Sequence, residues 1–163
     1  MNKNNNFGFT LIELVVVVAS VGLIMTSVVG MILGTFKAQD RTKTNNKIIE
    51  NSTWIVSQLR KNVLNSLSED ITCSADNLSI QIINSGDKKT TTLSCNKSGN
   101  KIASNSAVLN NNEVNVTDCG SFAVCQLDSA GKVVNVVFNF GIGTTTGGVS
   151  SNQNFTTTIT VRD

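Results

Sequence analysis

A run of 23 residues without a charged side chain, residues 14–36, constrains this 163-residue chain more than any other feature. As an α-helix the run would be about 35 Å long, because each residue adds ~1.5 Å, and the hydrocarbon core of a bilayer is ~30 Å thick. The chain beyond it is mostly polar, and Asn, Ser and Thr supply 57 of all 163 residues. We therefore expect residues 9–36 to form a transmembrane helix attached to a polar domain.

The composition argues against several classes of function. The chain contains no histidine, which removes the commonest catalytic base and the mixed Cys/His zinc sites. Its net charge of +2 is too small to indicate binding to nucleic acid. No phosphate-binding loop and no paired-carboxylate site stands out in the sequence. We predict that the protein is not an enzyme, has no cofactor and no metal, and binds no specific nucleic acid.

Three interpretations compete for the apolar run. A secretory signal cleaved after Ala19 explains it poorly, because 17 further uncharged residues follow that position. A plain membrane anchor explains the length but not Glu13, because a carboxylate at the start of an apolar segment is costly in a bilayer and indicates a specific partner. The third interpretation comes from the residues that surround Glu13.

Residues 8–14 read Gly-Phe-Thr-Leu-Ile-Glu-Leu and follow a short leader whose one charged side chain is Lys3. This string resembles the processing site of type IV prepilins and type II secretion pseudopilins. The resemblance implies that a prepilin peptidase in the membrane cleaves after Gly8, releases residues 1–8 as a leader peptide and methylates the new amino terminus of Phe9. The β-rich remainder and its last residues are similar to minor pilins and J-type pseudopilins.

The resemblance also gives Glu13 a role in assembly. In that family, the equivalent glutamate pairs with the terminal amine of a neighbouring subunit inside a helical filament. Two opposite charges in an apolar filament core are costly alone and tolerable together, so the pair would select the correct register. Alternatively, Glu13 merely reaches the membrane surface from its position near the helix end.

The predicted location follows from the same resemblance. The precursor would be a single-pass protein of the cytoplasmic membrane with its leader inside, and the mature subunit would join other pilin subunits in an extracellular or periplasmic filament. The distribution of positive charge alone favours the opposite orientation, because four basic side chains closely follow the span. They are Lys37, Arg41, Lys43 and Lys47. The alternative function is a membrane-anchored adhesin that does not polymerise.

Residues 37–67 contain neither proline nor glycine and carry apolar side chains at helical spacing, which predicts an amphipathic continuation of the helix. The predicted apolar stripe comprises Ile48, Ile49, Ile55, Val56, Leu59, Val63 and Leu67. We expect Trp54 to pack with it, and the less favoured alternative is that Trp54 stacks on a ligand. The resemblance implies what covers the stripe, namely a C-terminal antiparallel β-sheet. The expected fold is therefore α+β and pilin-like, with residues 68–163 forming a β-rich globular head.

The head shows the alternating pattern of β-strands. Five to seven strands in a meander-like antiparallel sheet are expected. The clearest strands are residues 78–82, 89–95, 101–109, 133–140 and 155–161, and residues 133–140 are apolar enough to be central. Residues 141–154 are rich in Gly, Thr and Ser, so we expect a long loop that either binds a ligand or only connects strands.

The head contains four cysteines, Cys73, Cys95, Cys119 and Cys125. An even number in a domain expected outside the cytoplasm suggests two disulfides, and four cysteines allow three pairings. We favour Cys73–Cys95, which would join the first hairpin to the segment that leaves the helix, and Cys119–Cys125, which would close a short local loop. Buried free thiols are the alternative, and the spacing suits a zinc site poorly.

Overall fold

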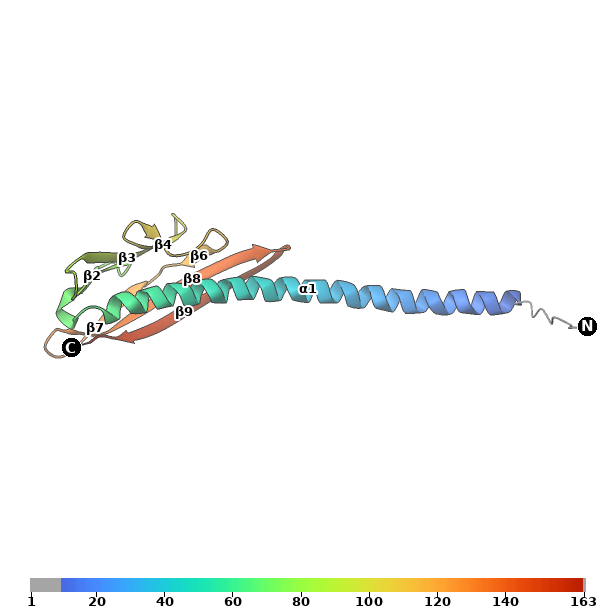
Figure 1. Ribbon diagram of the computed structural model, residues 1–163, viewed down its shortest axis with the longest axis horizontal. Coiled ribbons are helices and arrows are strands. Elements are labelled where there is room, and N and C mark those ends of the chain that lie inside the picture. The colour runs from blue at the N-terminus through green and yellow to red at the C-terminus, as the bar shows by residue number, and fades with distance from the viewer. Residues whose placement is uncertain (1–9, 163) are drawn as a thin grey trace, which may run out of the picture. The chain divides into compact units, whose positions relative to one another are not determined.

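The computed structural model describes residues 10–162 and contains one long helix followed by short and long strands (Figure 1). Helix α1 covers Leu11–Leu64, and a single 3₁₀ turn, η1, covers Ser68–Asp70. The chain divides into two compact units, Met1–Asp40 and Arg41–Asp163. All strands belong to the second unit, and they pair antiparallel, so the predicted α+β fold is confirmed.

In the second unit, α1 buries one stripe of side chains against the strands. Ile48, Ile55, Leu59 and Val63 are completely buried, as their spacing predicts. The predicted stripe was too wide, because Ile49 is 51% exposed and Val56 is only partly buried. The helix also ends at Leu64 rather than Leu67.

The prediction that Trp54 packs against the sheet was wrong. Its side chain is 55% exposed, whereas its neighbour Ile55 is completely buried. Successive residues of an α-helix point about 100° apart, because 3.6 residues complete one turn. Ile55 therefore occupies the buried stripe, and Trp54 lies on a flank of the helix.

The first sheet is a meander of five strands in the order β1-β2-β3-β4-β5. The strands are β1 (Ile71–Cys73), β2 (Ser79–Ile83), β3 (Thr90–Asn96), β4 (Lys101–Ser104) and β5 (Ala107–Val108). In the turn between β1 and β2, Asp76 accepts hydrogen bonds from the Ser74 hydroxyl and the Leu78 N–H, which hold the pKa of Asp76 below its usual range. Such turns close the meander locally.

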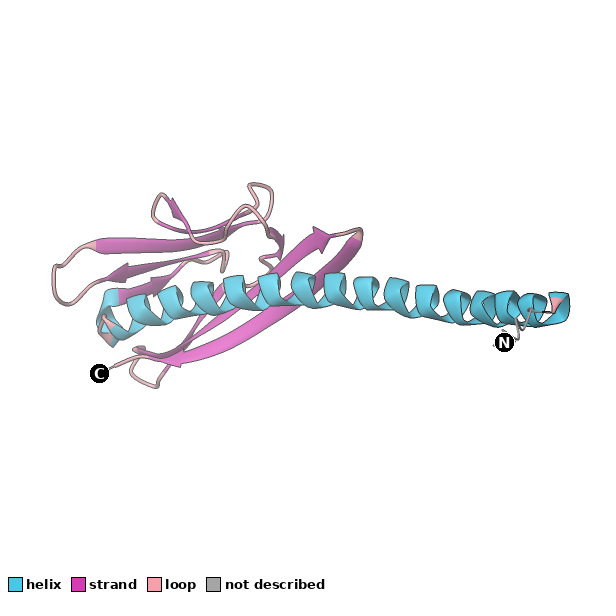
Figure 2. Ribbon diagram, turned by 45° about the vertical axis from the view of Figure 1, so that its right-hand side comes forward, coloured by secondary structure: helices cyan, strands magenta, loops and turns pink. Residues whose placement is uncertain are grey.

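The second sheet is built on one long central strand, β8 (Val133–Thr146). Strand β9 (Val149–Thr160) pairs with nearly the whole of β8 on one edge. On the other edge, β7 (Ala123–Leu127) and β6 (Asn115–Asp118) pair with successive parts of β8. The long hairpin runs obliquely beside the helix in both views (Figure 1, Figure 2). The head therefore has two sheets, whereas the sequence predicted one.

The predicted loop at residues 141–154 is also corrected by this hairpin. All of these residues except Gly147 and Gly148 belong to β8 or β9, and those two form the turn with φ values of 58° and 79°. The composition is typical of a loop, but backbone pairing from Gly141↔Asn154 to Thr146↔Val149 makes the segment a continuous ladder.

Two disulfides join the sheets, so the number of bridges is as predicted, but the predicted pairing is wrong. The bonds are Cys73–Cys125, with Cα atoms 5.9 Å apart, and Cys95–Cys119, with Cα atoms 5.7 Å apart. Cys73 lies on β1 and Cys95 on β3, with β2 between them. Two strand spacings of ~4.8 Å place such Cα atoms more than ~9 Å apart, beyond the ~7 Å that a disulfide can span. Cys119 and Cys125 each bond across to the first sheet instead of to each other.

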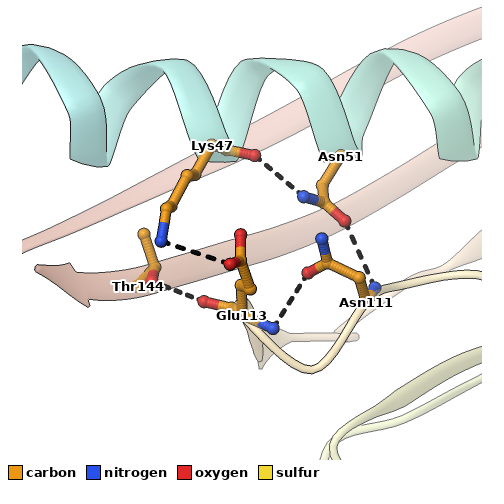
Figure 3. A network of polar contacts seen from close by, with 5 residues as sticks. All are labelled: Lys47, Asn51, Asn111, Glu113 and Thr144. Carbon is orange, nitrogen blue, oxygen red and sulfur yellow. Dashed lines mark hydrogen bonds and ion pairs between the residues drawn. The ribbon is translucent and has the colours of Figure 1, made fainter.

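Both sheets and the helix share one hydrophobic core. It includes Ile55 and Leu59 from α1, Ile80 and Leu93 from the first sheet, and Phe138 from the second. A polar network on the helix flank adds to this packing (Figure 3). There the Lys47 ammonium lies 3.4 Å from the carboxylate of Glu113. The Thr144 hydroxyl donates to the Glu113 carbonyl at 2.5 Å, which ties the loop before β6 to both α1 and β8.

Candidate functional site: the apolar half of helix α1

The first unit exposes its apolar side chains along the whole described length. Leu11, Leu23 and Met31 are each more than 70% exposed. The remaining large apolar side chains up to Phe36 are between 43% and 72% exposed. They are Ile12, Leu14, Val15, Val16, Val17, Val18, Val21, Ile24, Met25, Val28, Val29, Ile32, Leu33 and Phe36. A continuous apolar surface of this kind is not stable in water and indicates contact with lipid or with other protein.

The few polar side chains in this half are satisfied by the helix itself. The hydroxyls of Ser20, Ser27 and Thr35 each donate to the carbonyl four residues earlier, at 2.7, 3.2 and 2.9 Å. The hydroxyl of Thr26 donates to the Leu23 carbonyl at 2.9 Å. In an apolar medium an unpaired hydroxyl is costly, so these bonds make the segment compatible with lipid or with a dry helical bundle. By length and hydropathy, α1 is sufficient to cross a membrane.

Glu13 lies in the first turn of α1 and closes its amino-terminal end together with Thr10. Its Oε2 atom accepts hydrogen bonds from the backbone N–H and the hydroxyl of Thr10, each at 3.2 Å, and the Glu13 N–H donates to Thr10 Oγ1 at 3.4 Å. This reciprocal pattern is a capping box, which satisfies backbone donors that a helix start leaves unpaired. A carboxylate in the first turn also interacts favourably with the helix dipole.

The capping role of Thr10 was not predicted, although the sequence contained its signal. A threonine followed three positions later by glutamate, before an apolar run, is the usual pattern of a capping box. The sequence interpretation gave Glu13 a partner in a neighbouring subunit or a position at the membrane surface, and no partner within its own helix. In the single chain, the carboxylate of Glu13 already has partners from Thr10.

The structure separates the predicted site residues into two groups. Glu13 lies on the apolar half of α1, whereas Cys73, Cys95, Cys119 and Cys125 belong to the second unit and hold its two sheets together. The predicted processing residues Gly8 and Phe9 lie outside the described residues. The apolar half therefore offers one charged group, the exposed carboxylate of Glu13, on a surface of otherwise uncharged side chains from residue 10 to residue 36.

Comparison of the chain with protein-family models, with curated proteins and with solved structures found no match.

Proposed function

We propose that this protein is a structural subunit of a type IV pilus or type II secretion-like filament, of the minor pilin or pseudopilin kind. In this proposal, prepilin peptidase cleaves after Gly8 and methylates Phe9. The mature subunit then remains anchored in the cytoplasmic membrane until it is transferred into a helical filament. The observation that carries the proposal is the string Gly-Phe-Thr-Leu-Ile-Glu directly before an uncharged helix whose large apolar side chains are exposed.

Both environments of the proposed life cycle suit the apolar half of α1. Its length matches a bilayer, and its hydroxyls are bonded within the helix, so it needs no water in either place. A Cβ atom added to Gly22, Gly30 or Gly34 would meet nothing within 4 Å apart from the adjoining backbone of the helix. These small residues leave room for a neighbouring helix to approach closely.

Two sequential measurements test this proposal. Intact-mass spectrometry of the chain purified from membranes of a cell that has prepilin peptidase is expected to give residues 9–163 plus one methyl group. A mass that begins at Met1 would favour the plain anchor, and a mass that begins at Ser20 would favour a cleaved signal peptide. A Gly8→Val variant is the matched control and is expected to stay uncleaved, because it places a branched side chain at the position after which the family's peptidase cuts.

Filament formation is tested by shearing cells and imaging the released material. Electron microscopy with antibody labelling is expected to find the chain in filaments. Mass spectrometry of the same material would give its abundance relative to other subunits. A processed chain that remains entirely in the membrane would support the alternative, a membrane-anchored adhesin that does not polymerise. Protease protection of intact cells would establish which side of the membrane holds the β-rich head.

A further inference from the structure

An open groove of about 640 Å³ lies beside α1 in the second unit. Its helical wall is lined by Glu50, Trp54 and Ser57, together with Asn51 and Thr53. The opposite wall is lined by Val108, Leu109, Asn110, Asn111 and Glu113. The spacings of four and three residues place Glu50, Trp54 and Ser57 on one face. Trp54 is the chain's one tryptophan, and it is 55% exposed, while Val108 across the groove is 45% exposed. Exposed tryptophan next to apolar side chains is typical of the anchor positions of protein interfaces.

Most polar groups that line the groove are already used inside the chain. The side chain of Asn51 donates to the Lys47 carbonyl at 3.0 Å and accepts from the Asn111 N–H at 3.2 Å (Figure 3). The side chain of Asn110 accepts from the Ile102 N–H at 2.8 Å and donates to the Asn100 carbonyl at 3.1 Å. These bonds fix both walls, so the groove is a formed feature of the fold.

Two exposed carboxylates and the indole face of Trp54 also line the groove. Glu50 is exposed, and Glu113 is 56% exposed at its side chain although it pairs with Lys47. With Lys47 included, the two carboxylates leave the groove with one negative charge in excess. A carboxylate attracts a cation, and so does the face of an indole ring, with which Arg and Lys form cation–π contacts. The chemistry of the groove therefore selects a basic side chain with an apolar stem.

We propose that the groove binds the basic segment Arg41 to Lys43 of a second copy of this chain. The side chains of Arg41 and Lys43 are both exposed in the structure. Arg41 and Lys43 are two residues apart, or about 200° around the helix, so one of the two can enter a groove on either side of α1 while the other points away. This inference rests on the proposed function and narrows it to a subunit that lies next to further copies of itself, because the contact requires adjacent copies with their helices parallel.

The positions along the helix define the offset between the two copies. The middle of the basic segment is residue 42, and the midpoint between Glu50 and Trp54 is residue 52. These positions are ten residues apart, which corresponds to ~15 Å along the helix at ~1.5 Å per residue. Because α1 is continuous over this range, the segment cannot reach the groove of its own chain. A neighbour advanced by ~15 Å along the axis would place its Arg41 and Lys43 level with residues 51 and 53, between Glu50 and Trp54.

The arrangement has the symmetry that a filament needs. The groove and its complement occupy different places on the same chain, so each copy uses one surface to bind the next copy and another to be bound. Such head-to-tail contacts generate rings or open helical assemblies rather than closed pairs. A helical filament also gives each copy several neighbours at different axial offsets.

Photocrosslinking in filament-forming cells tests this contact on the full chain. The bait carries Trp54→p-benzoylphenylalanine, and the co-expressed prey carries a different C-terminal tag, so crosslinks between copies are separated from those within one copy. The expected crosslink joins bait to prey, and mass spectrometry is expected to place it within residues 38–47 of the prey. Attachment elsewhere on the prey, to another protein or to a glycan, or no attachment at all, would overturn the inference.

Charge reversal provides the matched variants. Glu50→Lys in both copies is expected to lower the crosslink yield about tenfold, because like charges would face each other. Adding Arg41→Glu and Lys43→Glu restores opposite charges with the signs exchanged and is expected to restore the yield. Glu69→Lys, at an exposed position outside the groove, is the control and should have no effect. Unchanged yield in Glu50→Lys, or no recovery in the triple variant, would contradict the proposed contact.

Two further measurements keep the outcomes distinct. Each variant is checked for both disulfides by its mobility without reductant, which identifies chains that failed to fold. Electron microscopy of the same cells then separates the two proposals. Filaments that contain the chain but show no crosslink overturn the groove contact and leave the proposed function intact. Absence of the chain from every filament overturns both.

Discussion

Glu13 serves the single chain and, in our proposal, the assembly, and these roles differ chemically. Capping needs a hydrogen-bond acceptor at the third helical position, which glutamine supplies as well as glutamate. Pairing with the amine of a neighbouring subunit needs the negative charge. In the structure, Glu13 Oε2 accepts from Thr10. A substitution that keeps the acceptor and removes the charge therefore separates the two roles.

We expect Glu13→Gln to be processed and inserted normally but to be incorporated into filaments about tenfold less well, which corresponds to ~1.4 kcal/mol. Immunoblots of sheared filaments and of the membrane fraction from the same cells give the ratio. Thr10→Ala is the matched control, because it removes the capping hydroxyl at a cost of about 1 kcal/mol and keeps the charge. Equal incorporation of Glu13→Gln and the unchanged chain would exclude the charge pair.

Gly141 lies in the central strand β8 where three neighbours leave no room for a side chain. A Cβ atom there would lie 2.6 Å from Asn154 Oδ1, 2.7 Å from Thr117 Oγ1 and 2.9 Å from Asp118 Cβ. The last of these atoms cannot move without moving its backbone. The sequence predicted that Gly141 lies in a loop. Instead, it lies in a strand that is paired on both edges, and side chains of β6 and β9 cover it.

We expect Gly141→Ala to lower the free energy of unfolding by about 1–3 kcal/mol, because overpacking forces neighbours to shift. Urea titration of the full chain in detergent, followed by the fluorescence of Trp54, measures this change. Gly86→Ala is the control, because a Cβ atom added to Gly86 would lie 3.5 Å from its nearest neighbour, Asn84 Oδ1, which is an ordinary van der Waals contact. If Gly141→Ala lowers the free energy of unfolding no more than Gly86→Ala does, the strands can move apart at Gly141.

At the scale of elements, strand existence was easier to predict than strand partnership. The alternation at residues 78–82 and the apolar run at 133–140 correctly predicted β2 and the first part of β8. The short strands β6 and β7 were not predicted, because four or five residues with little alternation carry no clear signal. Without them, the second sheet and the true partners of the cysteines could not be deduced.

The two disulfides differ in the length of chain that they close. Cys73–Cys125 spans 52 residues and Cys95–Cys119 spans 24. On the chain-entropy model, we expect Cys73→Ser with Cys125→Ser to cost about 4 kcal/mol, and Cys95→Ser with Cys119→Ser about 3 kcal/mol. Urea titrations of the two double variants compare these costs. A larger loss of unfolding free energy on removal of Cys95–Cys119 than on removal of Cys73–Cys125 would contradict the expectation.

Peptide mapping without reductant checks the pairing itself. Trypsin leaves Cys119 and Cys125 on one peptide, and chymotrypsin separates them after Phe122. The structure predicts that the fragment with Cys125 is linked to that with Cys73, and the fragment with Cys119 to that with Cys95. A link between Cys73 and Cys95 would restore the pairing that the sequence alone favoured.

At the scale of the whole molecule, the chain consists of two units with different requirements. The second unit contains both disulfides and the complete hydrophobic core. The described part of the first unit buries none of its large apolar side chains. The second unit therefore has what independent folding requires, and the first needs lipid or other subunits.

We expect residues 41–163, exported with a cleavable signal peptide, to fold as a soluble domain with both disulfides formed. Thiol titration in denaturant should find no free thiol, and urea unfolding should be cooperative. The full chain should instead sediment with membranes. Aggregation of the truncated chain, or the presence of free thiols, would show that the apolar half is needed for folding of the head.

The sequence by itself determined the division of this protein. An uncharged run of 23 residues and an amphipathic continuation specify one long helix, and period-two patterns specify strands, because both signals are local. Only the tertiary structure decided that the strands form two sheets, that Cys73 bonds to Cys125 and that Trp54 faces a groove. These features depend on which distant segments pair, and pairing is decided by burial and hydrogen bonding across the whole domain rather than by neighbours along the chain.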